Sequence, residues 1–76
     1  MPESDGTERL TPRQLRYVLA LAELGSFRQA AAYLAVPPGV LSREIAAVER
    51  ACGAPLFERL ARTAPATRAG TELAEA

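Results

Sequence analysis

The tripeptide Pro37-Pro38-Gly39, set between two helical patterns, is the feature that most constrains how this chain can fold. Proline cannot continue a helix, so the tripeptide predicts a tight turn between a helix over 27–34 and another over 38–52. Ser26 and Gln29 have the spacing of a capping box at the start of the first helix. Apolar residues at spacings of four, three and four share one face of the second helix: Leu41, Ile45, Val48 and Cys52. Two short helices joined by a tight turn are typical of a helix-turn-helix.

A third helix is expected before this pair. Thr11 is a preferred N-cap, Pro12 suits the first helical position, and Gln14 completes a capping box. Gly25 is expected to end the helix in the left-handed conformation. Arg16 lies off the apolar stripe of this helix, so we predict a solvated surface charge. The predicted buried stripe consists of Leu15, Val18, Leu19 and Ala22.

The segment after the second helical pattern predicts a wing beside the helices. Gly53 and Pro55 end the helix, and Leu56-Phe57 is expected to close the bottom of the core. Residues 57–66 are too short for a helix between two prolines and fit two short strands joined by a turn. Thr67 is then expected to cap a last helix, whose apolar positions are Ala69, Leu73 and Ala74.

Composition excludes several classes of protein. Seventy-six residues make one small domain, and a single cysteine gives no internal disulfide. No apolar run is long enough to span a membrane, and the acidic N-terminus is unlike a signal peptide, so we expect a cytoplasmic protein. The sequence has no histidine, no metal-ligand cluster and no glycine-rich phosphate loop, and Cys52 falls on the apolar stripe. We therefore expect no enzyme activity, no cofactor and no bound metal.

The charge distribution favours an anionic partner, although the net charge is zero. Between Ser26 and Gly70 there are six arginines against three glutamates, while the segments on either side are acidic. All nine basic residues are arginine, which is the better planar donor to phosphate and guanine. A coding bias towards high GC content would give the same arginine richness, so composition alone leaves both explanations open.

With these residues in place, the sequence resembles the N-terminal DNA-binding domain of LysR-type transcriptional regulators. The resemblance runs without a gap from Leu10 to Gly70. It rests on Leu15, Ser26-Phe27, Ala30-Ala31, Leu34, Ser42, Ile45, Glu49, Gly53, Leu56-Phe57, Arg59, Arg62, Thr67, Ala69 and Gly70. It implies a mostly α fold with a small β-wing, the winged helix-turn-helix, in a bacterial transcription regulator that binds double-stranded DNA.

The resemblance also implies a domain organisation. Residues 1–9 are expected to form a flexible tail and residues 10–70 the winged helix-turn-helix, with the helix-turn-helix at 27–52 and the wing at 57–66. Residues 71–76 would begin a truncated linker helix, through which such regulators form dimers. The chain would then lack the effector-binding domain and hold no site for a small-molecule effector. In one departure from the family pattern, Pro38 stands where the family usually has glutamine.

The candidate DNA contacts lie on the second helix of the pair and around the wing. Arg43 is the expected base reader, because its guanidinium can bond bidentately to guanine. Ser42 flanks it, and the small Gly39 would allow close approach to the groove. The expected phosphate contacts are Arg28, Arg59 and Arg62. For each arginine, a solvated surface charge is the competing interpretation.

A second function remains open on the sequence alone. A winged helix can keep its fold, lose DNA readout and serve as a protein-interaction module; Pro38 and the zero net charge favour that alternative. Salt dependence separates the two, because binding through several phosphates weakens steeply as salt rises.

Overall fold

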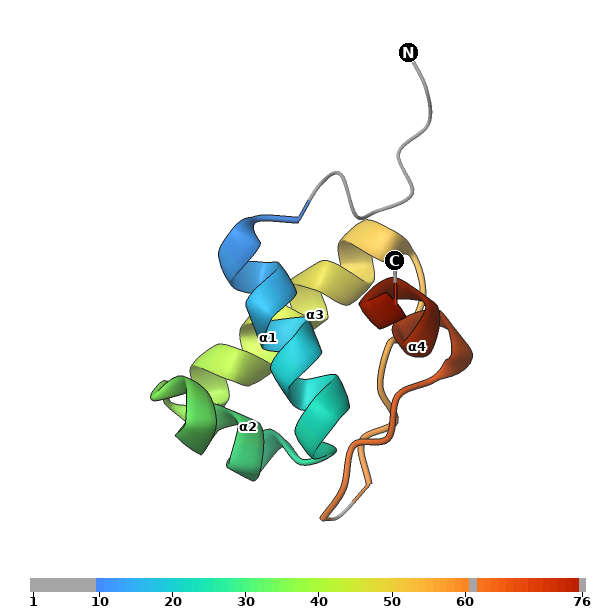
Figure 1. Cartoon of the computed structure of the whole chain (residues 1–76). Helices are drawn as coiled ribbons and strands as arrows, with labels where there is room; N and C mark the ends of the chain where they lie inside the picture. Colours follow the sequence, from blue (N-terminus) through green and yellow to red (C-terminus); the bar gives the residue numbers. More distant parts are fainter. Residues whose placement is uncertain (1–9, 61, 76) are drawn as a thin grey trace.

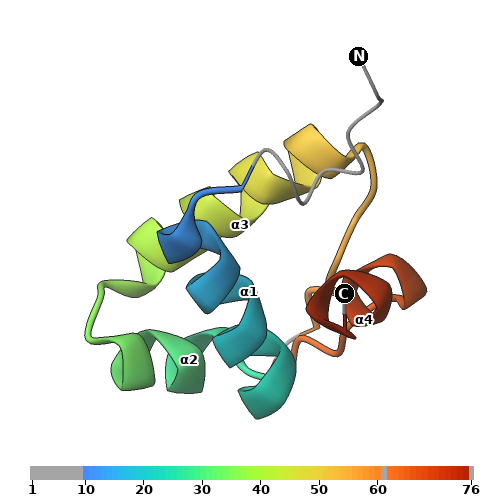
Figure 2. The ribbon, with the colours of Figure 1, turned by 45° about the horizontal axis from the view of Figure 1, so that its top comes forward.

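A computed structural model describes residues 10–60 and 62–75, and those residues form four helices (Figure 1). The helices are α1 (Pro12–Leu24), α2 (Phe27–Leu34), α3 (Pro38–Cys52) and α4 (Arg68–Glu75). Helix α1 contacts the other three, and α2 also packs against α3 (Figures 1 and 2). The predicted tail, residues 1–9, lies outside the described residues. No helix in the described ranges combines the length and the apolar character that a bilayer span requires.

The predicted start and end of α1 are confirmed. The Thr11 hydroxyl accepts a hydrogen bond from the Gln14 amide at 3.0 Å, and the Gln14 side chain accepts one from the Thr11 amide at 3.2 Å. Gly25 has a φ of 68° and donates its N–H to the Leu21 carbonyl at 2.8 Å. Both ends of α1 are therefore set by side chains and dihedral angles within a few residues of the boundary.

The predicted buried stripe of α1 is partly wrong. Val18 is fully buried, but Leu19 is 42% exposed. The other buried residues of α1 are Tyr17, Ala20 and Leu21, which were not predicted, and Leu15 and Ala22 are only partly buried. The reason is the central place of α1: neighbours on several sides make its buried face wider than the stripe of a helix packed on one side.

The turn of the helix-turn-helix consists of residues 35–37, so only Pro37 of the tripeptide lies in it. Ala35 ends α2 with a φ of 60°, and Val36 donates its N–H to the Ala31 carbonyl at 3.0 Å. Pro38 and Gly39 already belong to the first turn of α3. Proline fits there because the first helical amides have no partner inside the helix. The predicted helix ranges 27–34 and 38–52 are confirmed, and the turn itself is 35–37.

Helix α3 presents its predicted apolar face to the core. Leu41, Ile45 and Val48 are buried, whereas Cys52, at the last turn, is only partly buried against them. Gly53 ends the helix with a φ of 76°. Leu56 and Phe57 are buried, which confirms their predicted place in the core.

The wing is an antiparallel loop with one β-bridge, between Phe57 and Ala66, in place of the two short strands that were predicted. The Glu58 N–H donates to the Pro65 carbonyl at 2.9 Å. Pro65 has no N–H, so it cannot donate a backbone hydrogen bond to the opposite segment of the wing. The Ala64 N–H donates to the Gly25 carbonyl at 2.7 Å, which fixes the wing beside the α1–α2 junction.

Thr67 caps α4 as predicted and also ties it to the preceding loop. Its hydroxyl accepts from the Gly70 amide at 3.1 Å and donates to the Pro55 carbonyl at 2.7 Å. Gly70 is buried so closely against Leu56 that a Cβ atom there would collide with the Leu56 carbonyl. Leu73 is buried in the same core as the other helices, so α4 packs on the domain through this residue.

Candidate nucleic-acid interface

The solvent-facing side of α3 carries the first group of predicted contact residues. Gly39, Ser42 and Arg43 are exposed in the first two turns of the helix, on the side away from the core. The Arg43 Nη1 lies 3.8 Å from the position that a Cβ atom at Gly39 would occupy. The guanidinium therefore extends back along the helix towards its N-terminus, over a residue without a side chain.

A second group surrounds a hollow of about 570 Å³ between the helix-turn-helix and the wing. Arg28, from the start of α2, and Arg62, from the wing, both line it. Pro38, the first residue of α3, lies on the same wall. The remaining lining residues are Ser26, Phe27, Leu60 and Thr63. The structure thus brings Arg28 and Arg62, which are 34 positions apart in the sequence, to one hollow beside the start of α3.

Arg28, Arg43 and Arg62 form no ion pair with any residue in the ranges that the structure describes. All three are exposed. The acids closest to Arg43 in the sequence are occupied elsewhere: Glu44 pairs with Arg13 at 3.4 Å, and Glu49 pairs with Arg59 at 2.7 Å. These three guanidinium groups are therefore available to an anionic partner, although the whole chain has a net charge of zero.

Arg59 stands apart from the other predicted phosphate contacts. Its guanidinium pairs with Glu49 and lies over the Phe27 ring, 4.8 Å from the ring centroid. The side chain is 41% exposed, so part of it still faces solvent. Arg59 thereby joins three elements, since Glu49 belongs to α3, Phe27 begins α2, and Arg59 itself lies in the wing.

Glu49 has a larger role than its sequence position suggested. One carboxylate oxygen accepts hydrogen bonds from the amides of Leu56 and Phe57, at 2.8 and 3.3 Å, and the other accepts from Arg59. The carboxylate therefore fixes the loop that leads from α3 into the wing. The sequence marks Glu49 only through the family pattern. The loop amides lie seven and eight residues further along the chain, outside any helix, so no periodicity in the sequence links them to Glu49.

The polar end of α1 forms another link to α3. The Gln14 side chain donates to Glu44 at 3.1 Å, and the Arg13 guanidinium donates to the same carboxylate at 3.4 Å. These contacts hold the middle of α3 against the start of α1. Polar contacts thus fix α3 at two points along its length, through Glu44 to α1 and through Glu49 to the loop and the wing.

Comparison with known proteins assigns the chain to a protein family. Residues 12–71 match the family model described as "Bacterial regulatory helix-turn-helix protein, lysR family". The regulator TfdT of Cupriavidus pinatubonensis is 48% identical over 58 residues, which cover 76% of this chain and 25% of TfdT. ClcR of Pseudomonas putida is 43% identical over 63 residues, 83% of this chain and 21% of ClcR. The chain thus spans about a fifth to a quarter of the length of these curated relatives.

Solved structures agree with the sequence comparison. A crystal structure of the CbnR DNA-binding domain in complex with DNA superposes with a TM-score of 0.83 at 36% identity, over 87% of this chain and 76% of that one. An OxyR structure from Corynebacterium glutamicum gives a TM-score of 0.83 at 36% identity, over 88% of this chain and 21% of OxyR. The similarity therefore covers the helices and the wing together.

Proposed function

Because the chain belongs to the lysR family of bacterial regulatory helix-turn-helix proteins, we propose that its winged helix-turn-helix binds double-stranded DNA with sequence specificity. It is a domain of a transcription regulator and not of an enzyme. DNA is held in the bacterial cytoplasm, so that compartment is the proposed place of action. The CbnR domain, which is bound to DNA in its crystal structure, has the same fold.

The observation that carries the proposal is the set of exposed, ion-pair-free arginines around the start of α3. Arg43 is the proposed base reader, with Ser42 beside it and Gly39 allowing the helix to lie close to the groove floor. Arg28 and Arg62, at the shared hollow, are the proposed phosphate contacts. Arg59 is proposed to contact phosphate with the exposed part of its guanidinium while its other side stays on Glu49.

A dimer would give this domain the affinity that one half-site cannot supply. Two linked domains engage two half-sites with a high effective concentration for the second. The proposed linker helix is α4, which begins at Arg68 and buries Leu73 in its own domain. Dimerisation through the continuation of α4, like effector binding elsewhere in a longer regulator, belongs to the proposal.

The protein-interaction alternative rests on Pro38. This residue begins α3, the helix that carries Arg43, and it also lines the hollow, where its ring offers no hydrogen-bond donor or acceptor to a base. A module that has lost base readout would keep the fold and bind a protein surface. Its binding would depend weakly on salt.

The test is fluorescence anisotropy with duplexes selected from a random pool over several rounds, at low and near-physiological salt. DNA reading predicts an enriched motif and a binding constant that falls by about 0.9 log unit per log unit of salt for each phosphate neutralised. Arg43→Ala should reduce discrimination between the motif and a scrambled duplex. Arg50→Ala is the matched control, because Arg50 is an exposed arginine two turns further along α3 without an ion pair among the described residues.

Two other outcomes would decide against parts of the proposal. Salt-steep binding without an enriched motif would leave the phosphate contacts in place and refute base readout. Absence of binding at low salt would refute DNA binding by this chain and favour the protein-interaction module.

A further inference from the structure

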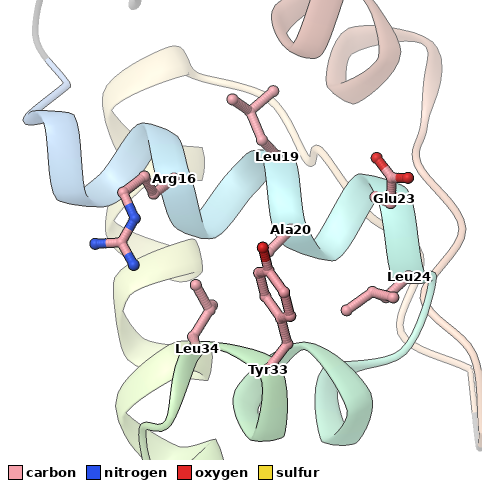
Figure 3. Close-up of a pocket in the computed structure, with 7 residues that line it drawn as sticks. All are labelled: Arg16, Leu19, Ala20, Glu23, Leu24, Tyr33 and Leu34. Carbon is pink, nitrogen blue, oxygen red and sulfur yellow. The ribbon is translucent and has the colours of Figure 1, made fainter.

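A hollow of about 480 Å³ lies between α1 and α2, and none of its lining residues belongs to the proposed DNA interface (Figure 3). Large apolar side chains are exposed around it: Leu19 is 42% exposed, Leu24 37% and Tyr33 75%. A small domain rarely leaves several large apolar side chains together in water without a partner. One arginine and one glutamate, Arg16 and Glu23, complete the rim.

This face of α1 carries one positive and one negative charge, at equal distances from its centre. Arg16, Leu19 and Glu23 stand at i, i+3 and i+7, which places them on one side of the helix. The two charges are separated by about 10 Å along the axis, at 1.5 Å per residue, which is too far for them to pair with each other. The midpoint between the charges falls between Leu19 and Ala20. Figure 3 shows Arg16 and Glu23 towards opposite ends of α1, with Leu19 and Ala20 between them.

We propose that this face binds a second copy of the chain, with the two α1 helices antiparallel. A two-fold axis that crosses α1 at right angles near Leu19 and Ala20 brings Arg16 of one protomer beside the partner's Glu23. The same operation brings Glu23 of the first protomer beside the partner's Arg16. A self-complementary patch of this kind is what an isologous dimer requires. A parallel arrangement would instead oppose like charges.

The charged groups are available for this contact. Arg16 and Glu23 take part in none of the ion pairs found within residues 10–60 and 62–75, and both are exposed. Arg13, one turn earlier on α1, is by contrast occupied by Glu44. Both Arg16 and Glu23 therefore lack an ion-pair partner among the described residues of their own domain.

Tyr33 enlarges the apolar part of the patch. Its ring extends from α2 across the groove towards Ala20, and Leu34 lies beside it (Figure 3). Helix α1 is 13 residues long, about 20 Å, so the contact is small compared with the interfaces of stable dimers. We therefore expect a weak dimer, with a dissociation constant of about 10 µM or higher.

This self-association goes beyond the proposed function and does not depend on it. It is measured on the free chain, without DNA, and it uses neither the arginines of the DNA interface nor the continuation of α4. A dimer through α4 is a distinguishable alternative, because α4 carries none of the residues that line this hollow.

The test is sedimentation velocity of the 76-residue chain at low salt, from about 10 µM to about 1 mM, the range set by the expected affinity. Arg16→Glu makes every charge on the face negative, and Glu23→Arg makes every charge positive. Each variant alone should dimerise about tenfold more weakly than the unmodified chain, since two attractive pairs become repulsive. An equimolar mixture of the two variants should restore association, because each face then meets its opposite.

The double variant, Arg16→Glu with Glu23→Arg, should also restore dimerisation. The matched controls are Arg50→Glu and Glu58→Arg, which reverse exposed charges away from this face and should leave association unchanged. Far-UV circular dichroism confirms that each variant is folded before it is compared. Arg16→Gln, which only removes the charge, replaces any reversal that unfolds the domain and should give a smaller loss of association.

Three results would overturn the proposal. A chain that stays monomeric over the whole range has no such interface. A dimer that is insensitive to both single reversals uses another surface, such as α4. Loss of association that neither the mixture nor the double variant restores would mean that Arg16 and Glu23 do not face each other across a two-fold axis.

Discussion

Glu49 and Arg59 form an ion pair of 2.7 Å that joins the last turns of α3 to the wing. The same carboxylate accepts hydrogen bonds from the amides of Leu56 and Phe57, and the guanidinium of Arg59 lies over Phe27. One side chain therefore holds the loop after α3, while its partner reaches the start of α2. Together with the hydrogen bond from Ala64 to Gly25, this pair fixes the position of the wing relative to α3.

Replacing the Glu49 carboxylate should loosen that connection. Glu49→Gln removes the charge opposite Arg59 and weakens acceptance from the two loop amides. The side chain of Glu49 is only 16% exposed, so we expect the free energy of unfolding to fall by about 1 to 3 kcal/mol. Urea denaturation followed by circular dichroism measures it. Glu58→Gln, at an exposed site without an ion pair in the described ranges, is the control; equal stability of the two variants would contradict the role of Glu49.

Arg59 and Arg62 should differ although both lie in the wing. Arg62→Ala should change the free energy of unfolding by no more than about 0.5 kcal/mol, because the side chain is exposed and has no ion pair in the described ranges. It should still weaken binding to all duplexes and reduce the salt slope by about 0.9. Arg59→Ala should lower both stability and DNA affinity. Anisotropy and urea denaturation on the same samples separate the effects, and a destabilised Arg62→Ala would be the unexpected result.

Gly39 should show opposite effects on stability and on binding. A Cβ atom there would meet only Arg43 Nη1 at 3.8 Å, an ordinary contact, so Gly39→Ala fits the free protein. Alanine is the better helix former, and we expect a gain of about 0.5 kcal/mol in the free energy of unfolding. If the α3 face lies close to the DNA groove, the added methyl group should weaken DNA binding. Unchanged affinity in the anisotropy assay would argue against close approach at this position.

The turn of the helix-turn-helix should tolerate glycine at Ala35. Its φ of 60° is a left-handed conformation that an L-residue with a side chain adopts at a cost. Ala35→Gly should therefore raise the free energy of unfolding by about 0.5 to 1 kcal/mol. Ala32→Gly, at an exposed site inside α2, should lower it by about as much. Thermal unfolding of the pair checks the sign, and a destabilised Ala35→Gly would show that the left-handed conformation is not strained.

Much of the local structure followed from the sequence. The ends of α1 were predicted from Thr11, Gln14 and Gly25, and the structure forms each of those contacts. The ranges of α2 and α3 were also confirmed. Pro38 is compatible with the predicted start of α3, because a proline fits the first position of a helix. The left-handed residue that ends α2 was not predicted, because it is an alanine, Ala35, which carries no sequence signal for that conformation.

Errors arose where packing between elements decides the outcome. Leu19 fits an apolar stripe on α1, yet it faces solvent because the neighbours of α1 bury a different set of residues. The wing was expected to hold two strands, and its described residues form one bridge, between Phe57 and Ala66. Its position is fixed by contacts with Glu49 and Gly25 as well as by its own pairing.

The sequence by itself determined the ranges of α2 and α3, the caps of α1 and the family, because these features depend on neighbouring or evenly spaced residues. Only the tertiary structure decided which arginines form ion pairs within the domain and which remain available to a partner. Arg13 finds Glu44 across 31 positions and Arg59 finds Glu49 across ten, while Arg28, Arg43 and Arg62 find no acid among the described residues. An ion pair depends on where two side chains meet in space, and a linear pattern does not contain that distance.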